Sequence, residues 1–332
     1  MSNDAGAVLV DRRMVPVPTS ISRAAADALR SMVGDDGVPL NALHRLPAAE
    51  DRAAWTALKE AAEANYARTI TDAAGSLRSA IDTITGGGLT IHVATPEAPI
   101  RPDCAIVDLH GGALVLGGGA ACRVGTRRQA DLLGIRCFGV DYRTPPEHPY
   151  PAALDDCLAA YRHVLERHVP GKVVIAGRSA GGNLAAALLL RGRKEGLPMP
   201  AGLVLLSPQV DLTESGDSFA VNRTVDVVLP GSLMASNRLY AGGADLADPL
   251  LSPLFGDLAG FPPAFLQTGT RDLFLSNTVR MHRALRRAGV RAELHVFEAM
   301  PHGGFTGGTP EELDLLGEVK AFVAARLEAT AV

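Results

Sequence analysis

The sequence has little cysteine and few of the features that place a chain in a specialised class. Its 332 residues include four cysteines, Cys104, Cys122, Cys137 and Cys157, which form no C-x-x-C pair. No group of cysteine and histidine residues has zinc-finger spacing, so we interpret the four as free thiols buried as small apolar side chains. A chain of this length buries a full core without covalent cross-links, and we expect no disulfides.

The chain also lacks a strong charge excess and a long apolar run. Its formal net charge is -4, which gives no long-range attraction for nucleic acid or anionic lipid. No stretch approaches the roughly 20 consecutive apolar residues that span a bilayer. Residues 1–18 do not resemble a secretory signal. We therefore predict a cytoplasmic protein with no membrane span and no nucleic-acid partner.

The sequence does contain a two-part pattern of apolar residues. Residues 1–75 have helical periodicity and no buried strand, so we interpret them as an N-terminal helical cap segment. Over residues 76–332, apolar runs alternate with amphipathic helices, which predicts an α/β catalytic domain whose mostly parallel sheet has helices on both faces. The alternation stops between Ser207 and Pro262. Because so long a connection is usually a lid or a binding element, we place a second cap insertion at about 217–241.

One motif indicates a catalytic nucleophile. Ser179 lies in Gly-Arg-Ser-Ala-Gly, residues 177–181, between a predicted strand and a predicted helix. A nucleophile elbow needs this context, because the serine adopts a strained backbone conformation and its small neighbours avoid clashes. The helix N-terminus also supplies N–H groups that stabilise negative charge. Taken alone, the motif fits an ordinary glycine-flanked turn equally well.

A second motif lies upstream of the first. His110, Gly111 and Gly112 directly follow the predicted strand at residues 105–109. In an oxyanion hole of this type, the glycine amides and the amide after the nucleophile, here that of Ala180, face the developing oxyanion. Each such donor contributes on the order of 3 kcal/mol. A glycine turn with a structural histidine is the alternative, but both motifs follow strands in the chain order that this chemistry requires.

Asp272 and His302 complete a predicted catalytic triad. Each follows a predicted strand, and the carboxyl ends of parallel strands meet at one edge of the sheet. We predict that His302 is the general base for Ser179 and that Asp272 fixes its tautomer and stabilises the imidazolium. Asp211, after the predicted strand at 203–206, is the main rival acid. The other histidines lie in predicted helices or strands, in a proline-rich turn, or upstream of the catalytic core.

Together these motifs resemble the hormone-sensitive-lipase-like branch of the α/β-hydrolase fold, a group of microbial esterases. The resemblance covers approximately residues 76–327 and extends to the segment at 140–156, Asp248-Pro, Ser252-Pro-Leu and Pro262-Pro263. It implies a small-molecule acyl ester as substrate and catalytic roles for the serine, aspartate, histidine and oxyanion glycines already named. It implies no cofactor and no metal, and it is compatible with a homodimer formed through the last strand or helix.

Some positions depart from the family's pattern. Ala113 ends the glycine run, Leu114 stands where an aromatic residue is usual, and Gly304 is an extra glycine after the catalytic histidine. Arg178, directly before the nucleophile, replaces a residue that is usually acidic. It reverses a charge beside the elbow, and would either pair with a carboxylate on a neighbouring loop or favour anionic substrates.

The leading hypothesis is hydrolysis of small to medium acyl esters through an acyl-enzyme, with lactone, amide or natural-product deacylation open on the same triad. A non-catalytic, receptor-like binding protein is the alternative of another class, but such relatives lack the catalytic histidine that this chain has at position 302. The glycines at 117–119 do not form a nucleotide-binding fingerprint. Cap residues that we expect to line the substrate pocket, although core packing explains each equally well, are Trp55, Tyr66, Phe219, Leu229, Met234 and Tyr240.

Overall fold

A single sheet forms the centre of the computed structural model, which describes residues 14–43, 45–305 and 307–328. In spatial order its strands are β1 (Ala80–Gly86), β2 (Leu89–Thr95), β4 (Arg136–Val140), β3 (Ala105–Leu109), β5 (Val173–Arg178), β6 (Gly202–Leu206), β7 (Ala264–Gly269) and β8 (Ala292–Phe297). β2 runs antiparallel to β1 and β4, and all other neighbours are parallel. The prediction of a mostly parallel sheet is therefore confirmed.

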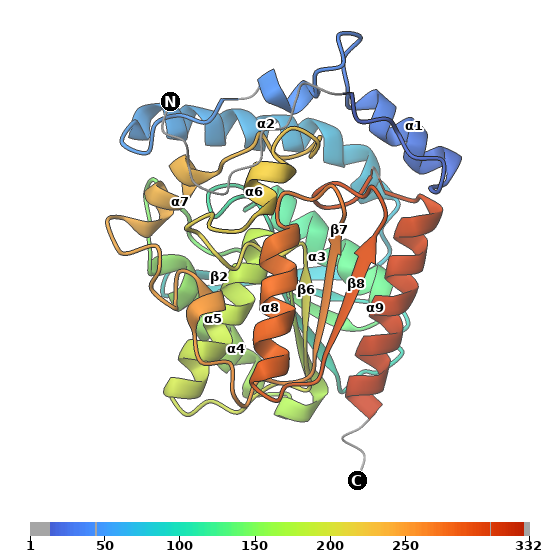
Figure 1. Ribbon diagram of the computed structural model, residues 1–332. Helices are drawn as coiled ribbons and strands as arrows, with labels where there is room; N and C mark the ends of the chain where they lie inside the picture. The colour runs from blue at the N-terminus through green and yellow to red at the C-terminus, as the bar shows by residue number, and fades with distance from the viewer. Residues whose placement is uncertain (1–13, 44, 306, 329–332) are drawn as a thin grey trace.

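Helices cover both faces of this sheet (Figure 1). One face packs against α4 (Ala152–Leu165), α5 (Ala180–Lys194) and α8 (Leu275–Arg287). The other packs against α3 (Ala120–Leu133) and α9 (Pro310–Glu328), where the rings of Phe265 and Phe322 lie 5.6 Å apart. Every side chain of β3 is buried, as expected for a central parallel strand, and each fully buried valine, isoleucine or leucine stabilises the fold by about 1.5–3 kcal/mol.

The remaining helices gather at the end of the sheet where β7 leads into the loop after Gly269 (Figure 1). They are α1 (Arg23–Ser31), α2 (Arg52–Gly75), α6 (Ser218–Val221) and α7 (Met234–Ala241); the short 3-10 helices of the chain are η1 (Leu40–Leu43), η2 (Pro170–Lys172) and η3 (Pro253–Phe255). Helices α1 and α2 belong to the predicted N-terminal cap segment, and α6 and α7 belong to the predicted cap insertion. Residues 1–13 of that predicted segment lie outside the described part of the chain.

One side chain joins these two cap segments. The amide nitrogen of Asn41 donates to the carbonyl oxygen of Asp226 at 3.0 Å and also to that of Leu229. Asn41 is buried, so these bonds satisfy polar groups that water does not reach. The segments therefore pack on each other through a specific polar contact as well as through apolar side chains.

The cysteines agree with the interpretation of free, buried thiols. All four cysteines are free and buried. Over the described residues, no helix combines the length and apolar character needed to cross a membrane.

Candidate active site

Ser179 lies in a tight turn between β5 and α5. Its backbone has φ 52° and ψ -120°, a conformation that costs a residue with a side chain on the order of 1–3 kcal/mol. The turn also requires glycine on both sides, because a Cβ atom on Gly177 would lie 2.2 Å from the carbonyl oxygen of Gly181. The Ser179 N–H donates to the carbonyl oxygen of Leu206 at 2.9 Å. The strained serine is therefore held in place by its neighbours.

The predicted triad side chains are linked by two hydrogen-bond contacts through His302. His302 Nε2 is 2.9 Å from Ser179 Oγ, and His302 Nδ1 is 3.0 Å from Asp272 Oδ1. Asp272 has no exposed surface, and its carboxylate also accepts hydrogen bonds from the N–H of Phe274 and the hydroxyl of Thr268, each at 2.8 Å. These contacts fix the carboxylate in the orientation that meets the imidazole.

The electrostatics of the pair favour its ionised form. Burial by itself would raise the pKa of Asp272, but the charge of His302 and the hydrogen bonds to the carboxylate outweigh burial and lower this pKa. Burial would lower the pKa of His302, but the charge of Asp272, its hydrogen bond and the charge of Asp226 raise that pKa above its ordinary value. The site therefore stabilises a positive charge on the imidazole.

Side chains of the cap insertion hold the loop that carries Asp272. Asp226 Oδ2 accepts from the N–H of Leu273 at 2.8 Å. The amide of Asn222 donates to the carbonyl oxygen of Asp272 at 2.8 Å, and the hydroxyl of Ser218 donates to that of Leu273 at 2.6 Å. The backbone polar groups beside the buried aspartate are thus paired with side chains from another part of the chain.

Sequence reasoning missed these three insertion residues. Ser218, Asn222 and Asp226 recur every four residues, which places side chains on one side of a helical turn. The structure has that turn, since the N–H of Asp226 donates to the carbonyl oxygen of Asn222 and that of Asn222 to Ser218. All three side chains are buried. The repeat of short polar residues was the available signal, but it does not say what they bind.

The predicted oxyanion residues lie directly beside the serine. A Cβ atom on Gly111 would lie 3.3 Å from Ser179 Cβ, so this glycine contacts the nucleophile. Gly112 has φ 127°, and a Cβ atom there would meet the carbonyl oxygen of Leu116 at 2.0 Å. Ala180 is the first residue of α5, where an N–H group has no partner within the helix. Gly111 and Ala180 therefore adjoin Ser179, as the prediction of an oxyanion hole requires.

Among the predicted pocket residues, Phe219 lies near the triad. Its ring centroid is 5.8 Å from that of Phe274, and the ring of Phe274 meets His302 edge-on at 4.8 Å. Leu229 belongs to the same apolar cluster, together with Ala113 of the oxyanion loop. These side chains form an apolar wall beside the imidazole.

The other predicted pocket residues have different surroundings. Trp55 is buried against Val115, just beyond the oxyanion loop, and Met234 is half-buried. Tyr240 has no exposed surface and belongs to the main core under the sheet, so it does not line an open pocket. Tyr66 is 49% exposed. Trp55 and Tyr240 are therefore packing residues in this structure, as the alternative interpretation of the sequence allowed.

The rival acid and the unusual arginine also have defined surroundings. Asp211 is buried, and its carboxylate pairs with Arg280 at 2.6 Å rather than with a histidine. Arg178 is exposed and, among the described residues, forms no salt bridge within 4.0 Å. Burial raises the pKa of Asp108 on the adjacent strand β3, and the positive charge of Arg178 offsets part of that rise. The carboxylate on which this charge acts is thus on a strand, and the alternative of an ion pair with a loop carboxylate is not seen among the described residues.

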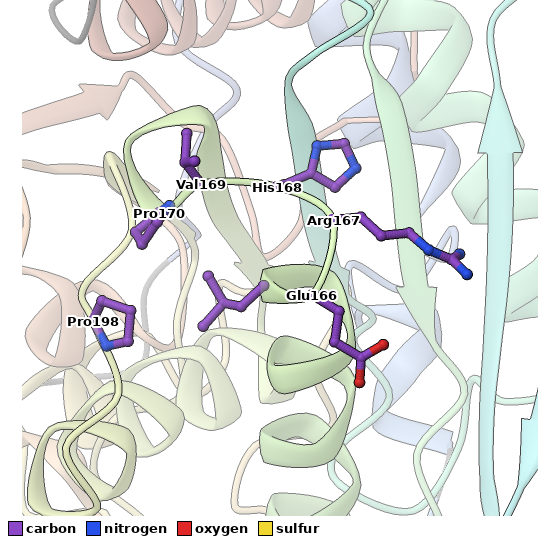
Figure 2. Close-up of a pocket in the computed structure, with 7 residues that line it drawn as sticks. Glu166, Arg167, His168, Val169, Pro170 and Pro198 are labelled. Carbon is purple, nitrogen blue, oxygen red and sulfur yellow. The ribbon is translucent and has the colours of Figure 1, made fainter.

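Two surface pockets lie apart from the triad. One pocket of about 310 Å³ is lined by residues 165–170 and Pro198 (Figure 2). Its lining includes the first residue of η2, which leads into β5, so this pocket lies at the amino ends of the strands. Another of about 490 Å³ lies between the start of α2 and the end of α7. Neither pocket is lined by a predicted triad or oxyanion residue. The candidate site therefore rests on the side-chain geometry at the carboxyl edge.

Comparisons with known proteins agree with this geometry. A family model described as alpha/beta hydrolase fold matches residues 106–306. An acetyl-hydrolase of Streptomyces hygroscopicus is 35% identical over 222 residues, which cover 65% of this chain and 74% of that protein. An esterase of Acinetobacter venetianus is 33% identical over 225 residues, covering 66% and 74%.

Solved structures give the same answer over nearly the whole chain. The crystal structure of an esterase E25 has a TM-score of 0.86 at 35% identity and covers 96% of this chain and 98% of that one. An esterase from the bacterial hormone-sensitive lipase family has a TM-score of 0.76 at 29% identity, covering 92% and 99%. The resemblance seen in the sequence is thus confirmed, and the chain belongs to the α/β-hydrolase fold family, with esterases of the hormone-sensitive-lipase branch among its structural neighbours.

Proposed function

We propose that this protein is a serine carboxylic ester hydrolase that acts on small to medium acyl esters through an acyl-enzyme intermediate. The observation that carries the proposal is the chain of hydrogen bonds from Ser179 through His302 to Asp272. The names of the relatives, esterase and acetyl-hydrolase, support an ester as the substrate class. The triad by itself is equally able to attack a lactone or an amide.

In the first half-reaction, Ser179 Oγ attacks the carbonyl carbon of the ester while its proton passes to His302 Nε2. The carbonyl electron pair moves to oxygen, where the N–H groups of Gly111, Gly112 and Ala180 stabilise it. The intermediate then collapses, the bond to the alcohol breaks, and His302 returns the proton to the leaving alkoxide. Asp272 stabilises the imidazolium during both transfers.

In the second half-reaction, water takes the place of the alcohol. His302 accepts a proton from the water as its oxygen attacks the acyl carbon, and the same N–H groups hold the oxyanion. Collapse expels Ser179 Oγ, which recovers its proton from the imidazole, and the carboxylic acid leaves. The apolar side chains of Phe219 and Leu229 beside the imidazole would contact the acyl or alcohol group.

The two cap segments, residues 14–75 and about 217–241, would cover this site and give it its selectivity. Their position at the carboxyl end of the sheet supports the assignment. The cytoplasmic location and the homodimer stay predictions.

A covalent probe combined with a panel of substrates tests the proposal. The purified full chain is incubated with a fluorophosphonate, and the labelled peptide is mapped by mass spectrometry, which we expect to identify Ser179. Turnover is then measured on p-nitrophenyl esters of increasing acyl length, beside a lactone and an anilide. Tight binding of acyl compounds without turnover or labelling would favour the receptor-like alternative instead.

The acid limb of the pH profile of kcat/KM should shift when Asp226 is replaced. His302 acts as a base only when neutral, and its pKa is raised, so activity should fall with decreasing pH at a midpoint above the usual histidine value of about 6.5. Asp226→Asn removes a negative charge that raises this pKa, and the acid limb should move to lower pH. Both carboxylate oxygens accept backbone N–H groups, one from Leu273 and the other from Val228 and Leu229, so asparagine would leave one side unpaired, which costs about 1–3 kcal/mol of stability.

Asp217→Asn is the matched control, because Asp217 is an exposed carboxylate of the same insertion. Its pH profile should coincide with that of the unmodified enzyme. An acid limb that stays in place in folded Asp226→Asn, measured from pH 5 to 9, would show that this carboxylate does not act on the imidazole.

Arg178→Asp should leave the reaction type intact. Arg178 follows Ala176 at the alternating spacing of a strand, so its side chain projects toward the face covered by α3 and α9. We expect kcat/KM for a short ester to stay within roughly tenfold, with a lower urea midpoint because buried Asp108 exchanges an opposite charge for a like charge. Complete inactivation of a folded Arg178→Asp protein would refute this.

A further inference from the structure

Three side chains that could hold a metal ion lie close together outside the triad. His110, Cys122 and Asp141 each offer one ligand atom, and these three atoms lie within 4.8 Å of one another. They come from the end of β3, the first turn of α3 and the residue after β4. His110 directly precedes the oxyanion glycines, so anything that binds this group also contacts the base of the loop.

One ring nitrogen of His110 keeps a lone pair that a metal could bind. Its Nδ1 lies 2.7 Å from the carbonyl oxygen of Gly111, an acceptor only, so Nδ1 carries the proton and Nε2 keeps its lone pair. Nε2 is buried and has no hydrogen-bond partner within the described residues. Ligating imidazoles generally donate through their other nitrogen in this way. The ring is also held by stacking on Tyr142, at a centroid distance of 4.0 Å and an interplanar angle of 8°.

A second imidazole, that of His92, lies beside the Asp141 carboxylate. His92 Nε2 lies 3.3 Å from Asp141 Oδ2, is buried, and forms no hydrogen bond of good geometry to the described residues. Its Nδ1 is 3.1 Å from the hydroxyl of Thr83. The Gly119 N–H donates to both oxygens of Asp141, at 3.0 and 3.1 Å, which fixes the plane of the carboxylate. One buried ring nitrogen without a hydrogen bond, Nε2 of His110, is therefore close to one thiol and one carboxylate, and His92 lies within ion-pair distance of that carboxylate.

We propose that His110, Cys122 and Asp141 bind a zinc ion, with His92 orienting the carboxylate. Zinc takes nitrogen, sulfur and oxygen ligands in a tetrahedron with bonds of about 2.0–2.3 Å, which sets its ligand atoms about 3.3–3.8 Å apart; the three side chains would fill three positions and a water molecule the fourth. The three ligand atoms lie within 4.8 Å of one another, so they would move closer by about 1 Å on binding. The thiolate disfavours magnesium and calcium, which prefer oxygen ligands.

Binding would replace the thiol proton of Cys122, which passes to the buffer. The ion would then tie the end of β3 to α3 and to the end of β4. Its role is structural, because ester hydrolysis by the triad needs no metal. The expected consequence is a more stable oxyanion loop, seen as a rise in the unfolding temperature of the protein when zinc is in excess over its dissociation constant.

Cobalt(II) titration of the chelator-treated full chain tests the site, because cobalt adopts zinc geometries and absorbs light. We expect a near-ultraviolet thiolate-to-cobalt band and visible d–d bands that saturate at about one equivalent and disappear on addition of zinc. Zinc should also raise the unfolding temperature. Failure of the unmodified protein to show a saturable thiolate band overturns the proposal.

Three variants identify the ligands. Cys122→Ser should lose the thiolate band, and His92→Gln should keep it with about 10–100-fold weaker binding. Cys104→Ser removes another buried cysteine outside the group and should titrate like the unmodified protein. A band that persists in Cys122→Ser, or that disappears in Cys104→Ser, would place the metal elsewhere and refute the assignment.

Discussion

Replacing Ser179 by alanine should reduce kcat on short p-nitrophenyl esters by roughly 10⁴–10⁶-fold, because the change removes the atom that forms the acyl-enzyme. Alanine occupies the strained turn as well as serine does, since both have one Cβ atom in contact with Gly111. The fold and the unfolding temperature should therefore change little. Initial rates, active-site titration with a phosphonate and near-ultraviolet circular dichroism together measure these quantities.

Ser31→Ala is the matched control, because this hydroxyl is exposed at the end of α1 and donates only to the carbonyl oxygen of Ala28. It should retain full activity and full phosphonate labelling. Turnover of Ser179→Ala at the rate of the unmodified enzyme, in a preparation free of contaminating esterase, would eliminate the acyl-enzyme mechanism.

Asp272→Asn should lower kcat by roughly 10⁴-fold, as the equivalent change does in other serine triads. The amide can donate to His302 Nδ1 and so favour the wrong imidazole tautomer, and the loss of charge removes a main cause of the raised His302 pKa. Unlike the nucleophile change, this one should leave phosphonate labelling slow rather than absent. Single-turnover rates and the time course of labelling separate the two effects.

Asp211→Asn decides between the two candidate acids. Asp211 is also buried, but it pairs with the partly exposed Arg280, so its loss should reduce stability and leave kcat within a few-fold. Equal losses of kcat in folded Asp211→Asn and Asp272→Asn would contradict the assignment of Asp272 as the orienting acid.

The sheet and the triad could be predicted because their signals are local in sequence. A run of apolar residues that ends in Gly-Arg-Ser-Ala-Gly specifies strand, turn and helix at once, and the structure has β5, the strained Ser179 and α5 there. The loops with Asp272 and His302 likewise follow strands, and parallel topology brings strand ends to one edge. The contacts observed between these side chains follow from the topology once the strands are assigned.

Interactions between distant segments could not be predicted in this way. Nothing near Asp226 in the sequence indicates that its carboxylate meets the backbone of Leu273, since the pairing depends on how the insertion folds back. The same holds for Cys122, whose lack of zinc-finger spacing suggested an inert thiol, although the fold brings it close to His110 and Asp141. Spacing rules detect metal sites built within one segment, not sites assembled from three.

The surroundings of cap side chains were equally inaccessible. Tyr240 and Phe219 are both aromatic residues of the predicted insertion, yet one is fully buried in the main core and the other lies one ring away from His302. Periodicity identifies an apolar face but not which neighbour covers it. Pocket assignments from composition alone therefore mix packing residues with those near the chemistry.

The pairing between the predicted cap insertion and the loop of the proposed catalytic acid limits how this enzyme can be redesigned. A chimera that receives the insertion of a relative would lose the side chains of Asn222 and Asp226 unless the donor supplies equivalents, and with them the hydrogen bonds to Asp272 and Leu273. Altered selectivity would then come with a misaligned aspartate and a slower catalyst. Grafts that retain these two positions and vary the segment around Phe219 should change substrate range without that loss.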